Sequence, residues 1–389
     1  MQASHGIFGI MVREFHRLLS RPLYLFCMVV APLICCLFFT TLMDNGLPQN
    51  MPVGVVDDDN TSTTREVLRN MDAFSQVELT ASYESVSSAR RAMQQGRIYA
   101  FYYIPKGTTD ELLAGRRPKV SFYTNNSLLI AGSLIYRDLR TMSVLANASV
   151  GLETLRAKGV TDPMAMTFLQ PIVIDTHPLS NPWLNYSVYL NNTILPGILM
   201  ILIFMITVYS IGSELKEGTG RAWLAMADND MLVAAAGKLL PHTAIFFVVA
   251  SLYDLYLYGV LSFPCHSGIL PLLLASLLMV LASQAFGVLF ITVLPTLRLA
   301  LSACSLWGVV SFSISGFSFP VMAMHPSLQL LSNLFPLRHY FLIYINQTLN
   351  GYPMVYAWKS YVMLLCFVLL PLLLLKRLRT VMLNYDYIP

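Results

Sequence analysis

The chain has 389 residues, of which 56% are hydrophobic and only 12% are charged. An ordinary soluble domain carries roughly 25% charged residues, so this composition excludes a water-soluble protein and indicates an integral membrane protein. The formal net charge of +4 reflects basic residues that flank apolar segments, which makes nucleic-acid binding a poor explanation.

The N-terminal stretch mixes apolar and charged side chains. Apolar residues from Ile7 to Leu19 recur at nearly helical spacing, with Arg13, Glu14 and Arg17 among them. Such a pattern predicts an amphipathic helix that lies in the membrane interface. The alternative is a plain basic flank that only sets the topology of the next segment.

Six apolar runs are long enough to cross a bilayer, which takes about 20 mostly apolar residues. The first run is too long for the apolar core of a signal peptide, so we interpret it as a retained anchor. Basic residues gather in the short segments on one side of the runs, and positive flanks stay in the cytoplasm, so both termini are expected there. The six runs are Pro22–Met43, Thr193–Ser213, Leu239–Leu261, Ile269–Val293, Leu299–Val321 and Trp358–Leu375.

Between the first two runs the composition changes to that of a soluble α/β domain. Short β-rich segments alternate with helical patterns, such as the capping-box form at Thr63–Glu66 and the long stretch from Ser127 to about Lys158. We therefore expect a small sheet with helices outside the membrane. The predicted strands are 52–57, 98–104, 119–124 and 172–174.

Three adjacent carboxylates, Asp57, Asp58 and Asp59, follow the first predicted strand. Neighbouring strand residues point to opposite faces of a sheet, and the spacing of a calcium loop is absent. A strand-to-helix turn is therefore favoured over a metal site. The chain also lacks a phosphate-binding loop, a hydrolase nucleophile motif and paired Cys or His ligands, so we expect no catalytic residue, metal or cofactor in this chain itself.

A charged loop separates the second and third apolar runs. Glu214 and Glu217 are three residues apart, so on a short helix they share a face that could pair with basic residues of a partner. Lys216 lies between them, and Gly218 allows the backbone to turn. The alternative is an ordinary solvated turn.

Asp254 is an acid inside the third apolar run. At 1.5 Å per residue from Leu239 it lies roughly 24 Å along a core of about 30 Å, near the outer interface. Two interpretations remain open. One is a solvated or hydrogen-bonded interfacial acid in an aromatic belt with Tyr253, Tyr256 and Tyr258; the other is a residue of a substrate path or a proton-linked site.

Three separated stretches carry a family resemblance. They are Arg13–Pro22, then Glu214–Thr219 with Gly237–Pro241, and Ser315–Leu337. In order and spacing they resemble the membrane subunits of type 2 ATP-binding cassette (ABC) exporters, in the group with a large exterior domain between the first two spans. The exterior segment is similar too, so the resemblance covers essentially the whole chain. The chain departs from the family pattern at Arg221–Leu224 and at Met324–Pro326.

The resemblance implies a permease subunit of an ATP-driven exporter in a bacterial inner membrane, which moves a drug-like, lipid or other amphiphilic substrate out of the cytoplasm or the membrane. ATP and Mg²⁺ would bind to a separate cytoplasmic ATPase subunit. A second permease copy or a paralogue would complete a dimer, and a periplasmic adaptor with an outer-membrane channel would be a further partner. The implied ATPase-coupling residues are Arg13, Glu14, Arg17, Glu214, Lys216, Glu217, Gly218 and Thr219. The implied outer re-entrant region contains Gly316, Pro320, Pro326 and Pro336.

The expected architecture is thus an α-helical membrane protein with six transmembrane helices and an α/β periplasmic domain inserted between helices 1 and 2. Two other functions remain open: a membrane-anchored sensor or scaffold with a ligand-binding exterior domain, and a proton-coupled transporter that uses Asp254. The expected divisions are an interfacial helix at 1–21, the first span at 22–43, the periplasmic domain at 44–192, five spans at 193–376 with a coupling loop at 214–238 and the re-entrant region at 316–357, and a cytoplasmic tail at 377–389.

Overall fold

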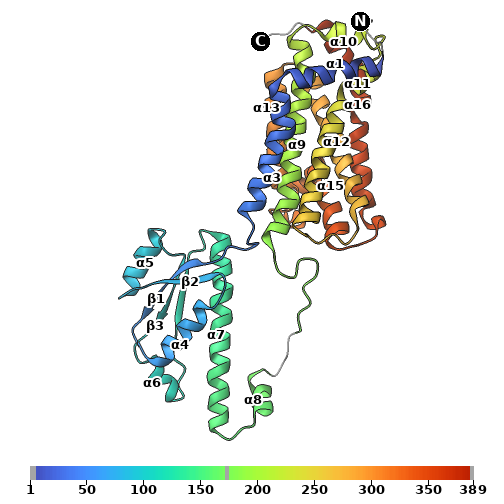
Figure 1. Ribbon diagram of the computed structural model, residues 1–389. Helices are drawn as coiled ribbons and strands as arrows, with labels where there is room; N and C mark the ends of the chain where they lie inside the picture. The colour runs from blue at the N-terminus through green and yellow to red at the C-terminus, as the bar shows by residue number, and fades with distance from the viewer. Residues whose placement is uncertain (1–5, 171–174, 386–389) are drawn as a thin grey trace. The chain divides into compact units, whose positions relative to one another are not determined.

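The computed structural model describes residues 6–170 and 175–385 (Figure 1). The chain divides into two compact units. The membrane unit consists of Met1–Asp44 with Pro178–Pro389, and the α/β unit consists of Asn45–His177. Each unit has its own buried apolar core.

Six helices of the described chain are long and apolar enough to span a membrane, which confirms the six predicted spans. Several are longer than predicted, and the fifth is shorter because it ends at Ile314, ahead of Gly316 with its φ of +105°. The last helix continues to Asn384, so the predicted tail from residue 377 begins as helix. The spans are α2–η1–α3 (Pro22–Leu25, Phe26–Val30 and Ala31–Leu42), α9 (Tyr186–Lys216), α11–η2 (Met231–Asp254 and Leu255–Val260), α12 (Ile269–Val293), α13 (Leu297–Ile314) and η5–α16 (Met354–Ala357 and Trp358–Asn384).

Helices α9 and α12 form the centre of the membrane unit and bury most of their side chains. They approach closely at Gly287, where an added Cβ would lie 2.6 Å from the Cβ of Thr207. Small residues commonly permit such contact between membrane helices. The first, fifth and sixth spans bury only 22%, 28% and 22% of their apolar windows, as expected of helices that face lipid or another subunit.

Short helices connect α13 to α16. Pro326 and Pro336 each begin a helix. The backbone N–H at this position makes no hydrogen bond within a helix, so proline, which lacks it, costs nothing there. Helix α15 packs against α9, α12, α13 and α16 (Figure 1). Pro320 precedes the first of these helices. The re-entrant role of this region stays a prediction. The short helices are η3 (Val321–Ala323), α14 (Pro326–Ser332), α15 (Pro336–Ile343) and η4 (Tyr344–Leu349).

Within the described residues, the α/β unit contains a four-stranded sheet in the order β2-β1-β3-β4. Its strands are β1 (Met51–Asp57), β2 (Val77–Ser82), β3 (Ala100–Ile104) and β4 (Ser121–Thr124). β1 pairs in parallel with β2 and β3, and β4 is antiparallel to β3. The sequence did not predict β2, and the predicted strand at 172–174 lies outside the described residues.

Five helices of the described part of the unit accompany the sheet, including the long α7 that the sequence predicted. The capping box of the first is formed by Thr61 and Thr64, two residues earlier than predicted. The turn before it is held by the Asp cluster: Asp57 accepts hydrogen bonds from the amides of Asp59 and Asn60 at 3.1 and 2.9 Å. The five are α4 (Ser62–Asp72), α5 (Val86–Gln94), α6 (Thr108–Leu113), α7 (Leu129–Ala157) and α8 (Asp162–Leu169).

Candidate functional site

The amphipathic N-terminal stretch forms a real helix, α1 (Ile7–Ser20), which lies across one end of the membrane helices (Figure 1). Ile10 and Leu18 are buried against the bundle, while Phe8 and Leu19 are about 70% exposed. The absence of a side chain at Gly237 lets α1 rest on α11, because an added Cβ would lie 2.9 Å from the Cβ of Ile10. The stretch is therefore a packed helix, and its place in the membrane interface stays a prediction.

The charged loop differs from the expected short coupling helix. Glu214 and Lys216 belong to the last turn of α9, and Gly218, with φ of +70°, ends that helix. A separate short helix, α10 (Gly220–Ala225), follows. Lys238, predicted to be the end of the loop, lies about two turns inside α11, because that helix already begins at Met231.

Glu14 of α1 reaches into the bundle and is only 1% exposed. Its carboxylate lies 2.7 Å from Lys238 Nζ and 3.0 Å from His242 Nε2, both on α11. The hydroxyl of Ser210 on α9 donates to the same carboxylate at 2.9 Å. One side chain of α1 is thus bonded to two membrane helices.

Glu214 of α9 is fully buried and forms the second centre of the cluster. Its carboxylate lies 2.9 Å from Arg13 Nη2 and 2.9 Å from Lys238 Nζ. Arg17 and the Thr219 hydroxyl also bond to it. The expectation that Glu214 presents its charge to basic residues of a partner is therefore wrong, because four groups of its own chain already satisfy this carboxylate.

Glu217 lies at the rim of the cluster and is partly exposed. Its two oxygens lie 2.8 Å from Arg17 Nη2 and 2.8 Å from Arg21 Nη2. The hydrogen bond from Arg21 to Glu217 raises the pKa of that guanidinium. Lys216 and Gly218 are exposed beside Glu217. These three residues are the part of the predicted coupling segment that another protein can reach.

We call this set of side chains the hub. Its acids and bases alternate, so that the buried carboxylate of Glu214 meets three cations and that of Glu14 meets Lys238 and the imidazole of His242. Burial on its own would raise the pKa of Glu14, but the hydrogen bond from His242 and the charge of Lys238 outweigh it and hold that pKa well below the ordinary value. Lys238 also lies over the ring of buried Trp223, 5.3 Å from its centroid. The hub consists of Arg13, Glu14, Arg17, Arg21, Ser210, Glu214, Glu217, Thr219, Lys238 and His242.

Sequence reasoning brought Arg13, Glu14, Arg17 and Glu214 into one functional group and placed Lys238 at the end of the coupling loop. It did not count Lys238 among the coupling residues, and it left out His242. The available signal was a lysine next to an apolar run. If the third span is taken to begin at Met231, Lys238 is a charged residue within a membrane helix. Such a charge normally has a partner of opposite sign.

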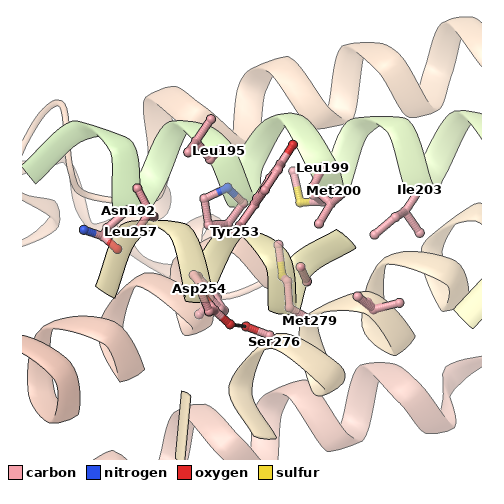
Figure 2. A pocket seen from close by; sticks show the side chains of 14 residues that line it. Asn192, Leu195, Leu199, Met200, Ile203, Tyr253, Asp254, Leu257, Ser276 and Met279 are labelled. Carbon is pink, nitrogen blue, oxygen red and sulfur yellow. Dashed lines mark hydrogen bonds between the residues drawn. The ribbon is translucent and has the colours of Figure 1, made fainter. Parts of the chain in front are cut away.

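Asp254 is the second site that the sequence singled out. It lies within the helix bundle rather than at a solvated interface. It is 4% exposed, and its Oδ2 accepts a hydrogen bond from the Ser276 hydroxyl at 3.0 Å (Figure 2). The predicted aromatic belt is also wrong at Tyr253, which is buried and donates to the carbonyl of Pro32. The α-helix changes to a π-helix at Leu255, directly after this acid.

Comparisons with known proteins agree with this architecture. No curated protein matches the chain. A scan against protein-family models matches residues 22–375 to the family described as ABC-2 family transporter protein. This match covers the first five spans and the last one as far as residue 375. The chain is therefore a multi-pass membrane protein that belongs to the ABC-2 transporter family.

Proposed function

We propose that this chain is the permease subunit of an ATP-driven exporter for amphiphilic molecules, and that a separate ATPase subunit binds ATP with Mg²⁺ and drives it. Family membership supports a non-catalytic transport subunit that works with an ATP-binding partner. Export as the direction, drug-like or lipid substrates, and the inner membrane as location are our extensions of that finding.

The hub is the observation that supports coupling to an ATPase. It bonds α1 to α9 through Glu214 and to α11 through Glu14, with Lys238 in contact with both acids. Breaking a buried ion pair by removing one partner costs about 3–5 kcal/mol, so the three helices resist separation. A force applied to α1 or to the segment after α9 would therefore move both membrane helices together.

The ATPase subunit would dock at the accessible edge of the hub. Lys216, Glu217 and Gly218 are exposed there, and α1 exposes apolar side chains such as Phe8 and Phe15. Basic residues of α1 gather at this end, which favours a cytoplasmic orientation for it and for both termini. The α/β unit would then lie in the periplasm, where an adaptor with an outer-membrane channel could meet it.

A second permease copy or a paralogue would complete the transporter. The described residues of one chain supply six helices able to span a membrane, which is too few for the arrangement expected of this family. The first, fifth and sixth spans expose apolar side chains that a partner subunit could cover.

The test is co-purification with candidate ATPase subunits in lipid nanodiscs, followed by a measurement of ATP hydrolysis. Lys216→Glu reverses an exposed charge that has no ion pair within the described residues, and we expect it to weaken association and lower hydrolysis. Lys359→Glu is the matched control, because it is also exposed but lies at the start of α16. If no ATPase associates with the wild type, a sensor or a proton-coupled transporter becomes the better explanation.

A further inference from the structure

A small cavity lies between α9, α11, α12 and α15, and Asp254 is the one charged residue among those that line it. The cavity has a volume of about 20 Å³, enough for one water or for an ammonium group of similar size. Figure 2 shows the Asp254 carboxylate beside Ser276, with side chains of α9 across the cavity.

Asp254 lacks a cationic partner. Within residues 6–170 and 175–385, no Lys, Arg or His nitrogen lies within 4.0 Å of its carboxylate. The single hydrogen bond from Ser276 satisfies only part of a carboxylate that can accept about four. An acid buried this deeply in a membrane bundle carries a cost of several kcal/mol unless a cation or proton reaches it.

The backbone supplies a second acceptor beside the cavity. Pro196 lies inside α9 and has no N–H, so the carbonyl of Asn192, four residues earlier, cannot receive its usual helical hydrogen bond. Both residues line the cavity. The hydroxyls of Ser276 and Tyr253 already donate to Asp254 and to the Pro32 carbonyl. The Asp254 carboxylate and the Asn192 carbonyl keep acceptor capacity beside the cavity, which suits a ligand that donates hydrogen bonds and carries positive charge.

The rest of the lining is apolar and runs along one face of α9. Leu195, Leu199 and Ile203 follow one another at four-residue spacing, away from Asp254 (Figure 2). Tyr253 and Tyr340 line the cavity too, and aromatic faces attract cations. The arrangement has one charged end and a longer apolar side.

We propose that Asp254 is the recognition residue for the cationic head group of the transported molecule, and that the substrate class is an amphiphile with one ammonium group and an apolar body. This inference rests on the proposed function, because it names the substrate of the same transporter. The side chains along α9 must move apart to admit the apolar body, since the present cavity holds only the head group.

The experiment compares three ligands with the same ten-carbon chain, decylammonium, decanol and decanoate, on the permease in nanodiscs of zwitterionic phosphatidylcholine. Wild type should bind decylammonium about tenfold or more tightly than the other two, the effect of about one charge-assisted hydrogen bond. Equal binding of all three ligands by wild type would overturn the proposal, and this comparison needs no variant to fold.

Asp254→Asn should remove the preference for decylammonium and leave decanol binding unchanged. Asp228→Asn is the matched control, because it deletes the same charge at an exposed turn away from the cavity. A preference that survives in Asp254→Asn would place the cation elsewhere and overturn the assignment. Binding of these ligands does not require an ATPase, so the two proposals can fail separately. If the wild type prefers decylammonium but never associates with an ATPase, only the proposed function is contradicted.

Discussion

Glu14 and Glu214 come from helices that are far apart in the sequence, yet their carboxylates share one ammonium group, that of Lys238, at 2.7 and 2.9 Å. All three side chains are at most 1% exposed. The shared cation offsets the repulsion between these two acids. Lys238 is therefore the residue of α11 that connects the acid of α1 with the acid of α9.

Replacing Lys238 tests this dependence. Lys238→Met keeps the aliphatic length but leaves two buried acids with one cation fewer, so we expect a loss of about 3–5 kcal/mol in unfolding free energy. Thermal unfolding in detergent, followed by fluorescence, measures it. Lys359→Met at an exposed position should change stability by less than about 0.5 kcal/mol. Similar melting temperatures for the two variants would contradict the central role of Lys238.

The pH dependence of stability should report on Glu14. Its pKa is lower in the folded protein than in the unfolded chain, because the bonds with His242 and Lys238 outweigh burial. The stabilisation is thus fully present above the unfolded value of about 4.3 and is lost as pH falls below that value towards the folded pKa. The stability difference between wild type and Glu14→Gln should be constant from about pH 7 to 5 and shrink below it. A difference that stays constant down to pH 3 would show that Glu14 is not held in its charged form.

The number of spans and the amphipathic α1 could be predicted because both depend on local composition and spacing. The length of an apolar run and the period of an amphipathic helix are visible in neighbouring residues. Most of the α/β unit was predicted for the same reason. Strand β2 was missed although Val77–Ser82 alternates between more and less buried positions, because Glu78 and Ala81 are residue types that are depleted in strands.

The pairings in the hub could not be predicted, since they join residues of α1, α9 and α11 that only the tertiary fold brings together. Glu214 illustrates the limit. Its spacing from Glu217 suggested a shared outward face, but helix α9 extends through both the span and this turn, so Glu214 faces α1 and α11 instead. Asp254 was placed near an interface by counting along one helix, and its burial comes from packing against α12.

The contact of α1 with α11 should be sensitive to Gly237. A Cβ at this position would lie 2.9 Å from the Cβ of Ile10 and 3.0 Å from the carbonyl oxygen of Ile7, and the backbone atom cannot move aside without shifting α1. Gly237→Ala should therefore weaken the docking of α1, even though alanine favours a helix by about 1 kcal/mol over glycine. Lower melting temperature and faster proteolysis of α1 would show this.

Gly259→Ala is the control for Gly237→Ala. Its added Cβ would lie at an ordinary 3.4 Å from a flexible leucine side chain, so the substitution should be tolerated. If Gly237→Ala behaves like this control, the close approach of α1 and α11 is not needed for the membrane unit to fold.

The Asp cluster of the α/β unit should stabilise a turn without any metal. Asp57 accepts hydrogen bonds from two amides of the turn and from the hydroxyl of Thr64 at 2.7 Å, and Asp59 accepts from the amide of Gly107 at 2.7 Å. Hydrogen bonding from Thr109 lowers the pKa of Asp59, as expected for a carboxylate that is already satisfied.

Asp57→Ala should cost about 1 kcal/mol, the typical value of a lost capping interaction. Thermal unfolding of wild type should be the same in a chelator and in millimolar Ca²⁺. A rise in melting temperature with Ca²⁺ that disappears in Asp57→Ala would instead identify these carboxylates as metal ligands and overturn their structural assignment.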